Sequence, residues 1–337
     1  MKFTKRTALI AGAAAVALAL AGCSGGGGQT GSTGEPGATN GSGGEGEGLQ
    51  IALVSKGFQH QFWQAVRQGA EEAAEEHGVT VTFEGPAAET EIDAQLQMLQ
   101  SAIDRGPDAI GFAALDPQAC IPLYDAAEAA GIPIVEFDAG CDSDYGQNLA
   151  ATDSMVAGAL AAEHMAELIN HEGQVGIVGH SQINSTGVQR RDGFVEYMEQ
   201  NEPNIEIVDI QYGDGDHLRS ADIAKAMLAA HPDLVGLYGT NEGSAIGIVN
   251  AVTELALPQG QVTIVGFDSG AAQIEAIRSG VMAGAITQDP IGIGRTVVEA
   301  AIAAVNGEEL EDFTDTGSMW YDANNLDDPE IAAVLYQ

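Results

Sequence analysis

The sequence IALVSKGFQHQFWQAV at residues 51–66 decides the expected fold. Its first four residues are a continuous apolar run, which is typical of a parallel strand buried on both faces. A polar loop with Lys56 and His60 follows, and the aromatic pair Phe62 and Trp63 stands just before an expected helix. Loops at the carboxyl ends of strands line the ligand crevice of an open α/β sheet. The stretch predicts a layered α/β domain that binds a small polar ligand with a flat apolar face. The alternative is that the two aromatics are packing residues of the core and do not contact a ligand.

Strands and helices alternate along the rest of the chain and then repeat. The apolar run at residue 51 returns at residue 175, an offset of 124, and Pro107-Asp108 returns as Pro232-Asp233, an offset of 125. An offset that stays nearly constant predicts two similar lobes, each with a parallel sheet and helices on both faces. The expected strands are 51–54, 79–83, 110–115, 132–137, 175–178, 205–210, 234–238, 262–267 and 283–287, and the main expected helices begin near 64 or span 93–105, 121–130, 154–169, 189–200, 220–230 and 291–305.

The first residues predict export. A basic start is followed by an apolar segment that is too short for an ordinary membrane span. The segment closes with Leu20-Ala21-Gly22-Cys23, which resembles the lipobox of bacterial lipoproteins. The resemblance implies a signal peptide at 1–22, a lipid on Cys23, and a protein held at the outer face of the cell membrane by that lipid alone. Residues 23–48 are rich in Gly and polar residues and predict a flexible tether.

Composition excludes several classes of function. The formal net charge is −37, from 12 basic and 49 acidic residues, which argues against nucleic acid as a partner. No phosphate-binding glycine loop and no nucleophile elbow occurs in the sequence. The seven His residues have neither an i, i+4 pair nor a Cys partner at ligand spacing. We therefore expect neither a cofactor nor a metal site.

Cys120 and Cys141 are the two cysteines of the folded region. Each follows an expected strand, and those two strands are expected to be neighbours in the sheet. Outside the membrane such thiols are free to oxidise. We therefore predict a disulfide between them, which closes a loop of about 20 residues.

Several short segments resemble the ribose-type periplasmic sugar-binding proteins of ABC transporters. They are the Phe62-Trp63 pair, GIPIVEFDAG at 131–140, TDS at 152–154, R-x-x-G-F at 190–194 and VGFDS at 265–269, in the order found in that family and within a region of likeness from 49 to 320. The resemblance implies a type I periplasmic binding protein that acts as a monomer, with two doubly wound lobes joined by a three-strand hinge. The expected lobes are 49–152 with 289–315, and 153–288 with 316–337.

The resemblance also implies a set of ligand-binding residues. Phe62 and Trp63 match aromatics that enclose the sugar ring, while the carboxylates and amides of the set match groups that bond to hydroxyls. The expected ligand-binding residues are Lys56, His60, Phe62, Trp63, Asp138, Asn184, Asn241, Asp268 and Gln288.

Three positions depart from the family pattern. Ala139 and Val188 stand where arginines are expected, and Gly215 stands where an aromatic is expected. Lys56 and His60 are therefore the leading candidates for the missing donors. Ribose does not carry over as the ligand, and a sugar, sugar derivative, cyclitol or other polyol is expected instead.

The predicted function is capture of a sugar-like polyol between the lobes and its delivery to the permease of an ABC importer, with no covalent chemistry. Closure is expected because bound ligand contacts both lobes at once. Two alternatives remain open at this point. One is a secreted glycan-active enzyme with Asp138 and Asp268 as paired carboxylates. The other is a receptor that presents its ligand to a sensor kinase or chemoreceptor.

Overall fold

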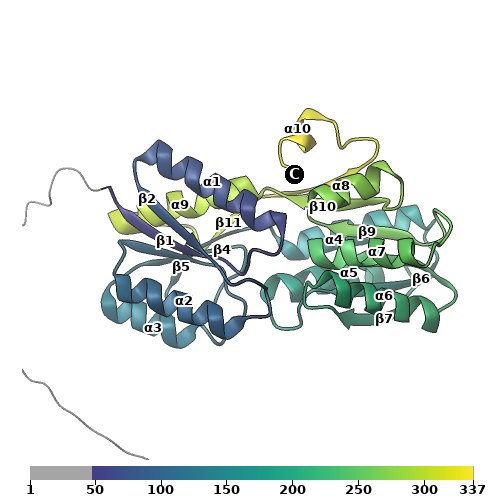
Figure 1. Cartoon of the computed structure of the whole chain (residues 1–337), viewed down its shortest axis with the longest axis horizontal. Helices are drawn as coiled ribbons and strands as arrows, with labels where there is room; N and C mark the ends of the chain where they lie inside the picture. The colour runs from purple at the N-terminus through teal and green to yellow at the C-terminus, as the bar shows by residue number, and fades with distance from the viewer. Residues whose placement is uncertain (1–47, 337) are drawn as a thin grey trace, which may run out of the picture. The chain divides into compact units, whose positions relative to one another are not determined.

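The computed structural model describes residues 48–336, which form two lobes, each a six-stranded sheet between layers of helices (Figure 1). The predicted fold of two doubly wound α/β lobes is confirmed. The predicted signal peptide, the lipidated Cys23 and all of the tether except residue 48 lie outside the described residues. No helix within 48–336 combines the length and apolar character needed to cross a membrane.

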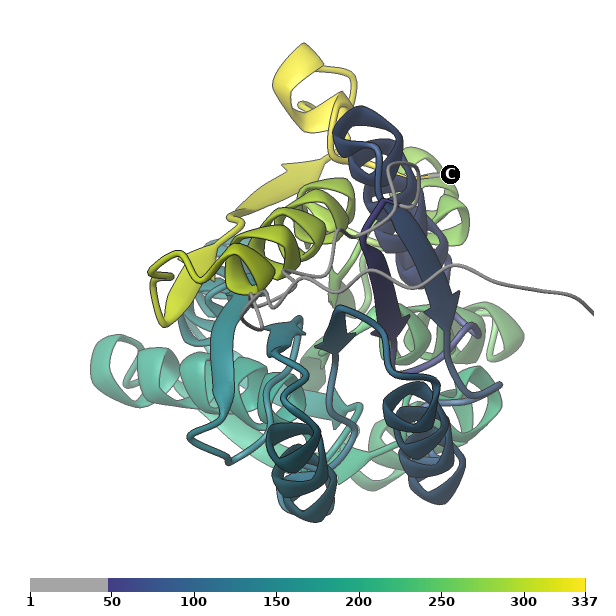
Figure 2. The ribbon, with the colours of Figure 1, turned by 90° about the vertical axis from the view of Figure 1, so that its left-hand side faces the viewer.

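The sheet of the N-terminal lobe has the order β11-β5-β4-β3-β1-β2, and all its neighbours are parallel. The run that opened the sequence forms β1, whose last four residues are buried because both faces of this strand are covered. Helices α1 and α9 cover one face, and α2 and α3 cover the other (Figure 2). The elements are β1 (Gln50–Val54), α1 (Gln61–His77), β2 (Thr80–Glu84), α2 (Ile92–Arg105), β3 (Ala109–Phe112), α3 (Ile121–Ala130), β4 (Ile134–Phe137), β5 (Gly146–Ala151), α9 (Pro290–Asn306) and β11 (Phe313–Asp315).

The sheet of the C-terminal lobe has the order β12-β10-β9-β8-β6-β7, which repeats the order of the first sheet as the sequence offset predicts. Helices α4 and α5 pack on one face, and α6, α7 and α8 on the other. The elements are α4 (Ser154–Leu168), β6 (Gly173–Gly179), α5 (Ser185–Asn201), β7 (Ile205–Tyr212), α6 (His217–Ala230), β8 (Leu234–Gly239), α7 (Glu242–Glu254), β9 (Thr263–Phe267), α8 (Ala271–Arg278), β10 (Gly284–Gln288), β12 (Ser318–Asp322) and α10 (Pro329–Ala332).

One strand of this second sheet is not parallel. β12 pairs antiparallel with β10, whereas β11 pairs parallel with β5. The chain leaves the N-terminal lobe at the carboxyl end of β11 and continues directly into the other lobe. It therefore enters that sheet at the carboxyl ends of the parallel strands, and β12 runs antiparallel to them.

The chain crosses between the lobes three times, between β5 and α4, between β10 and α9, and between β11 and β12. Two of these crossings are bonded to each other. The Thr152 hydroxyl donates to the Gly317 carbonyl over 3.0 Å, and the Asp153 amide donates to the Asp315 carboxylate over 3.2 Å. These two crossings therefore form a joined connection at one edge of the two sheets.

The C-terminal residues touch both lobes, although the sequence assigned all of 316–337 to the second. The ring of Tyr336 lies 6.2 Å from that of Phe62 and belongs to the core of the N-terminal lobe. Its hydroxyl accepts a hydrogen bond from the Ser269 amide of the C-terminal lobe over 3.1 Å. Long-range packing of this kind leaves no local pattern in the sequence.

Helix α7 is not among the helices expected from the sequence. Its glycines serve close packing. A Cβ at Gly247 would lie 2.4 Å from the Cβ of Ser220, and one at Gly243 would lie 1.9 Å from the Gly215 carbonyl oxygen. The glycines allow α7 to lie directly against α6 and its preceding loop, so tertiary packing overrides low helix propensity.

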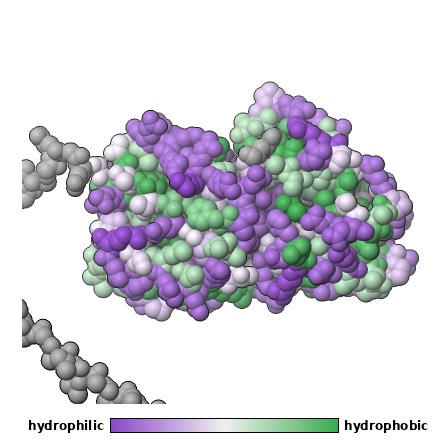
Figure 3. Space-filling model, viewed as in Figure 1, coloured by the Kyte–Doolittle hydropathy of each residue, from purple (hydrophilic) through white to green (hydrophobic). Residues whose placement is uncertain are grey.

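The face of the body that Figure 3 shows is mainly hydrophilic. Figure 3 shows polar residues over most of one face of this body, with hydrophobic residues in small separate patches.

A disulfide joins Cys120 to Cys141, and it links the loop after β3 to the loop after β4. The loop after β4 carries Asp138, so this bond restrains a segment that borders the cleft.

Candidate functional site

A small cavity of about 20 Å³ lies between the lobes, where the strand ends of both sheets face each other. Eight of the nine residues predicted to bind ligand line it, and Asn184 is the exception. The sequence did not predict the other three lining residues, Glu89, His180 and Arg190, as ligand-binding groups. The lining residues are Lys56, His60, Phe62, Trp63, Glu89, Asp138, His180, Arg190, Asn241, Asp268 and Gln288.

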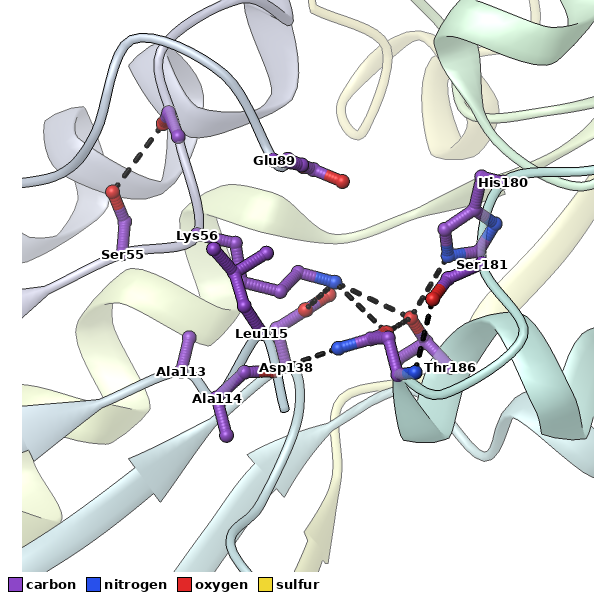
Figure 4. Close-up of polar contacts among 12 residues, drawn as sticks. Ser55, Lys56, Glu89, Ala113, Ala114, Leu115, Asp138, His180, Ser181 and Thr186 are labelled. Carbon is purple, nitrogen blue, oxygen red and sulfur yellow. Dashed lines mark hydrogen bonds and ion pairs between the residues drawn. The ribbon is translucent and has the colours of Figure 1, made fainter. Parts of the chain in front are cut away.

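Lys56 forms a buried ion pair with Asp138. The two side chains are 4% and 3% exposed, and Nζ lies 2.7 Å from the Asp138 carboxylate. Lys56 also reaches the other lobe, because its Nζ donates to the side-chain oxygens of Asn184 and Thr186, each over 3.3 Å (Figure 4). Its ammonium is thus largely committed to protein partners and joins the two lobes.

Asp268 stands at the centre of a second polar chain. One carboxylate oxygen accepts from the Gln288 amide over 2.6 Å, and the other accepts from the Glu242 backbone N–H over 2.9 Å. Burial raises the pKa of Asp268, and the nearby guanidinium of Arg190 offsets part of this effect. Gln288 in turn accepts a hydrogen bond from Arg190 over 3.1 Å. The carboxylate and amide thus lie side by side, as a polyol site requires.

Arg190 lies in the cleft. The sequence marked it only as the first residue of the R-x-x-G-F segment at 190–194. It is 3% exposed, and its guanidinium lies 3.7 Å from the ring centroid of Phe267. It also donates to the Thr240 carbonyl over 3.2 Å. Gly158 explains its placement, since a Cβ there would lie 2.4 Å from the Arg190 carbonyl oxygen, so α4 and α5 approach closely. The cleft therefore keeps one guanidinium even though the expected arginines at positions 139 and 188 are absent.

The aromatic pair belongs to both the core and the cavity. The rings of Phe62 and Trp63 meet edge to face with centroids 4.9 Å apart, and Trp63 is 1% exposed. The Trp63 indole N–H donates to Glu89 over 2.8 Å, which fixes the orientation of the ring. Burial acts to raise the pKa of Glu89, but the charges of Lys56 and His60 outweigh it and lower the pKa overall. The two interpretations of the aromatics, packing and ligand contact, are thus compatible.

His60 occupies space that Gly215 leaves open. A Cβ at Gly215 would lie 3.3 Å from the Nε2 atom of His60, which comes from the other lobe. The His60 ring also stacks on His217 with centroids 5.8 Å apart. Gly215 has replaced an aromatic expected from the family pattern, and His60 supplies a ring there from the opposite side. Its Nδ1 has no hydrogen-bond partner within the part of the chain that the structure describes.

His180 is held as a neutral ring. Its Nδ1 lies 2.8 Å from the Thr240 hydroxyl, and its Nε2 lies 3.3 Å from the Thr186 hydroxyl. Burial and the positive charges of Arg190 and Lys56 hold the pKa of His180 well below its ordinary value. A neutral imidazole has one donor and one acceptor, and the two threonine hydroxyls occupy both.

Asn184 lies outside the inner cavity and lines a second cavity of about 400 Å³. The Asn184 amide crosses the cleft and donates to the Ala114 carbonyl over 2.7 Å. Glu89 and His180 line both cavities and therefore stand where the two meet, and Figure 4 shows Glu89 pointing toward His180 across the gap. Asn184 thus connects the lobes beside the inner cavity.

The site offers hydrogen bonds and ring contacts. Asn241 begins α7 as its N-cap, with its side-chain oxygen bonded to the Ser244 amide over 2.9 Å, and its remaining amide group lies at the cavity. Within residues 48–336, no group of three or more His, Cys, Asp or Glu side chains is arranged to hold a metal ion. Buried carboxylates, amides and a guanidinium beside aromatic rings can bind a ligand that has many hydroxyls.

Comparisons with known proteins identify a family that this chain matches. Residues 51–309 match the family described as the periplasmic binding protein domain. The D-allose-binding periplasmic protein of Escherichia coli (strain K12) is 28% identical over 263 residues, which are 76% of this chain and 84% of that protein.

Two solved structures are also similar. A carbohydrate transporter solute binding protein from Agrobacterium radiobacter, in complex with D-arabinose, has 30% identity and a TM-score of 0.82, covering 86% of this chain and 99% of its own. An ABC transporter solute binding protein from Agrobacterium vitis, with bound D-fucose, has 32% identity and a TM-score of 0.82, covering 85% of this chain and 100% of its own.

Proposed function

The chain belongs to the periplasmic binding protein family, and we propose that it captures a sugar or sugar-like polyol between its lobes and delivers it to an ABC importer. The resemblance drawn from the sequence is thereby confirmed at the level of the family. The observation that carries the proposal is the set of rings and buried polar groups of both lobes that meet at the inner cavity. At about 20 Å³ this cavity has room for about one water molecule, so a sugar needs the lobes further apart than they are in this structure. Related proteins of known structure hold D-arabinose and D-fucose, which are ligands of this chemical kind.

We propose eight ligand-contacting groups around the cavity. Trp63 offers a ring face, and Asp138, Asp268 and Glu89 accept from hydroxyls. Asn241 and Gln288 bond to hydroxyls through their amides. Arg190 and His60 are the remaining donors. Lys56 contributes mainly through its ion pair with Asp138, which is a smaller direct role than the sequence suggested.

Delivery to a transporter follows from the family, whose members are substrate-binding proteins of transporters rather than enzymes. The family also has an extracytoplasmic location. We propose in addition that Cys23 carries a lipid that holds the protein at the outer face of the cell membrane. Mass spectrometry of the membrane fraction, with Cys23→Ser as the control that releases the protein, tests the anchor.

Thermal shift measurements test the binding function. Ligand that binds the native state raises the melting temperature by mass action. The panel contains D-allose, D-arabinose, D-fucose and D-ribose together with polyols and cyclitols. We expect at least one of them to stabilise the wild-type chain and to lose its effect in Asp268→Asn. A chain that none of these compounds stabilises contradicts the proposal, and formation of a product from a bound glycan would support an enzyme instead.

A further inference from the structure

Two helices that face the cleft have no side-chain cap from the residue before their first turn. α1 begins after His60, which makes no capping hydrogen bond, and its first turn has no acidic residue. α8 begins after Gly270, which has no side chain, and its own Gln273 side chain accepts from the Gly270 amide over 3.2 Å. The first N–H groups of a helix have no partner within the helix, and burial without one is costly. The start of α1, where Phe62 is buried, therefore needs an acceptor from elsewhere, whereas Ala271 at the start of α8 is exposed to water.

The opposite lobe supplies the acceptor in each case. Glu242, in the C-terminal lobe, accepts from the Gln61 amide over 3.2 Å with one carboxylate oxygen and from the Phe62 amide over 3.3 Å with the other. In return, the side-chain oxygen of Gln61 accepts from the Ala271 amide over 2.7 Å. A carboxylate at a helix N-terminus also interacts favourably with the helix dipole.

We propose that Glu242 and Gln61 form a reciprocal pair of helix caps between the lobes, which positions the ring-bearing first turn of α1 only when the cleft is closed. The inference rests on the proposed binding function, because it assigns these residues a part in ligand capture. Phe62 receives the cap directly, and Trp63 is the next residue. Opening the cleft separates the caps from their helices and returns all the groups to water.

Gly270 is consistent with this arrangement. A Cβ at this position would lie 3.0 Å from the Gln61 side-chain oxygen and 3.0 Å from the Glu242 carboxylate. The φ angle of Gly270 is −62°, which any residue adopts. An alanine there would thus crowd the two caps without straining the backbone.

The protonation state of Glu242 also affects closure of the cleft. Burial and the charge of Asp268 raise the pKa of Glu242 from 4.5 to about 7. In an open cleft, water returns that pKa toward its ordinary value. The closed state therefore binds the proton more tightly, so Glu242 favours closure on the acid side and this contribution is lost as pH rises through about 7.

Other titratable groups surround Glu242. Asp268 and Glu89 act on its pKa directly, and Glu242 acts on the buried hydroxyls of Tyr321 and Tyr336, whose pKa values are raised and which stay neutral.

His60 lies beside α7 and stacks on His217. Burial lowers the pKa of His217, so this ring opposes closure as pH falls below 6.5. Comparing each variant with the wild type at the same pH removes that contribution.

Small-angle scattering tests the caps on the chain alone and with D-allose added. In both conditions we expect Gln61→Ala and Gly270→Ala to have a larger radius of gyration than the wild type. Gln64→Ala is the control, since Gln64 lies on the same helix and is exposed. Equal radii in the wild type, Gln61→Ala and Gly270→Ala would overturn the inference, whether or not any sugar binds.

Calorimetry with D-allose tests the proton linkage. Between about pH 6.5 and about pH 8.5 the wild type should lose about fourfold in affinity relative to Glu242→Gln, and it should take up protons on binding near neutral pH. Glu254→Gln, an exposed change on the same helix, should behave as the wild type. A Glu242→Gln variant with the pH dependence and proton uptake of the wild type overturns the linkage. If D-allose does not bind at all while the scattering differences hold, the ligand assignment fails and the caps stand.

Discussion

Asp138 and Asp268 have the same backbone geometry at equivalent places in the two lobes. Each follows a buried phenylalanine at the end of a strand, and their φ angles are 60° and 78°. The Asp138 amide donates to Ala150 over 3.0 Å, and the Asp268 amide donates to Ile286 over 2.7 Å, in both cases on the next strand of the sheet. Left-handed backbone at a residue other than glycine is uncommon, and aspartate tolerates it better than most. The internal repeat thus places two carboxylates at the cleft.

Replacing Asp138 by asparagine should destabilise the protein. Asparagine tolerates the left-handed backbone, but Lys56 would become a buried charge without its partner. Breaking a buried pair in this way costs roughly 3 kcal/mol of unfolding free energy. Urea denaturation measures the change. The double variant Lys56→Met with Asp138→Asn should recover part of the loss, and a single variant as stable as the wild type would show that the pair contributes little.

Arg190→Lys should weaken ligand binding strongly, although the charge is kept. Lysine has no planar group to stack on Phe267 and cannot reach Thr240 and Gln288 together in the same way. The loss should be about 2 kcal/mol of binding free energy, measured by calorimetry with whichever sugar stabilises the wild type. Arg191→Lys is the control, because Arg191 bonds to Asp192 and Tyr212 outside the cavity. Equal affinity in both variants would remove Arg190 from the site.

Stability should fall on the acid side because of His180. The folded state keeps this ring neutral, with a pKa well below 6.5, whereas the unfolded chain protonates it near 6.5. A lowered pKa contributes stability above 6.5, and this contribution disappears as pH falls through the folded value. Denaturation curves at a series of pH values measure the slope. His180→Gln should have a shallower slope below 6.5, and an unchanged slope would assign the acid sensitivity to other groups.

Removing the disulfide should destabilise the N-terminal lobe. Cys120 and Cys141 are separated by 21 positions, and a loop of this size corresponds to roughly 3 kcal/mol in the chain-entropy model. The variant Cys120→Ala with Cys141→Ala, compared with the oxidised wild type by urea denaturation, measures this term. Ligand affinity should fall as well, since the bond restrains the loop that carries Asp138. Reduced wild type with the stability of the oxidised form would contradict the prediction.

The main elements of the fold were predictable because their physical causes are local. A continuous apolar run such as β1 is buried on both faces wherever a parallel sheet forms, and α1 has its apolar residues on one face. The elements that were missed lack such causes. β5, GQNLAA, has no continuous apolar run, β11 has only three residues, and β12 takes its direction from the path of the chain between the lobes. The helix α7 depends on glycines that serve contacts with α6.

The ligand-binding residues were predictable where their place in a loop after a strand brings them to the cleft. Eight predicted residues line the cavity because they follow strand ends that meet at one edge of each sheet. Arg190 was missed as a ligand group because it lies inside a helix, one turn beyond the loop. Glu89 follows β2, so its place after a strand end was a signal that could have found it.

The amino-acid sequence alone determined that two similar α/β lobes form and that their strand ends carry polar and aromatic side chains, because burial and periodicity act over a few residues. Only the tertiary structure decided which of those groups bind one another. Lys56 is committed to Asp138, His60 fills the space beside Gly215, and Glu242 caps a helix of the other lobe. These pairings join residues about 80 to 180 positions apart in the chain, so they are set only when the strands of a lobe, or the two lobes, pack together.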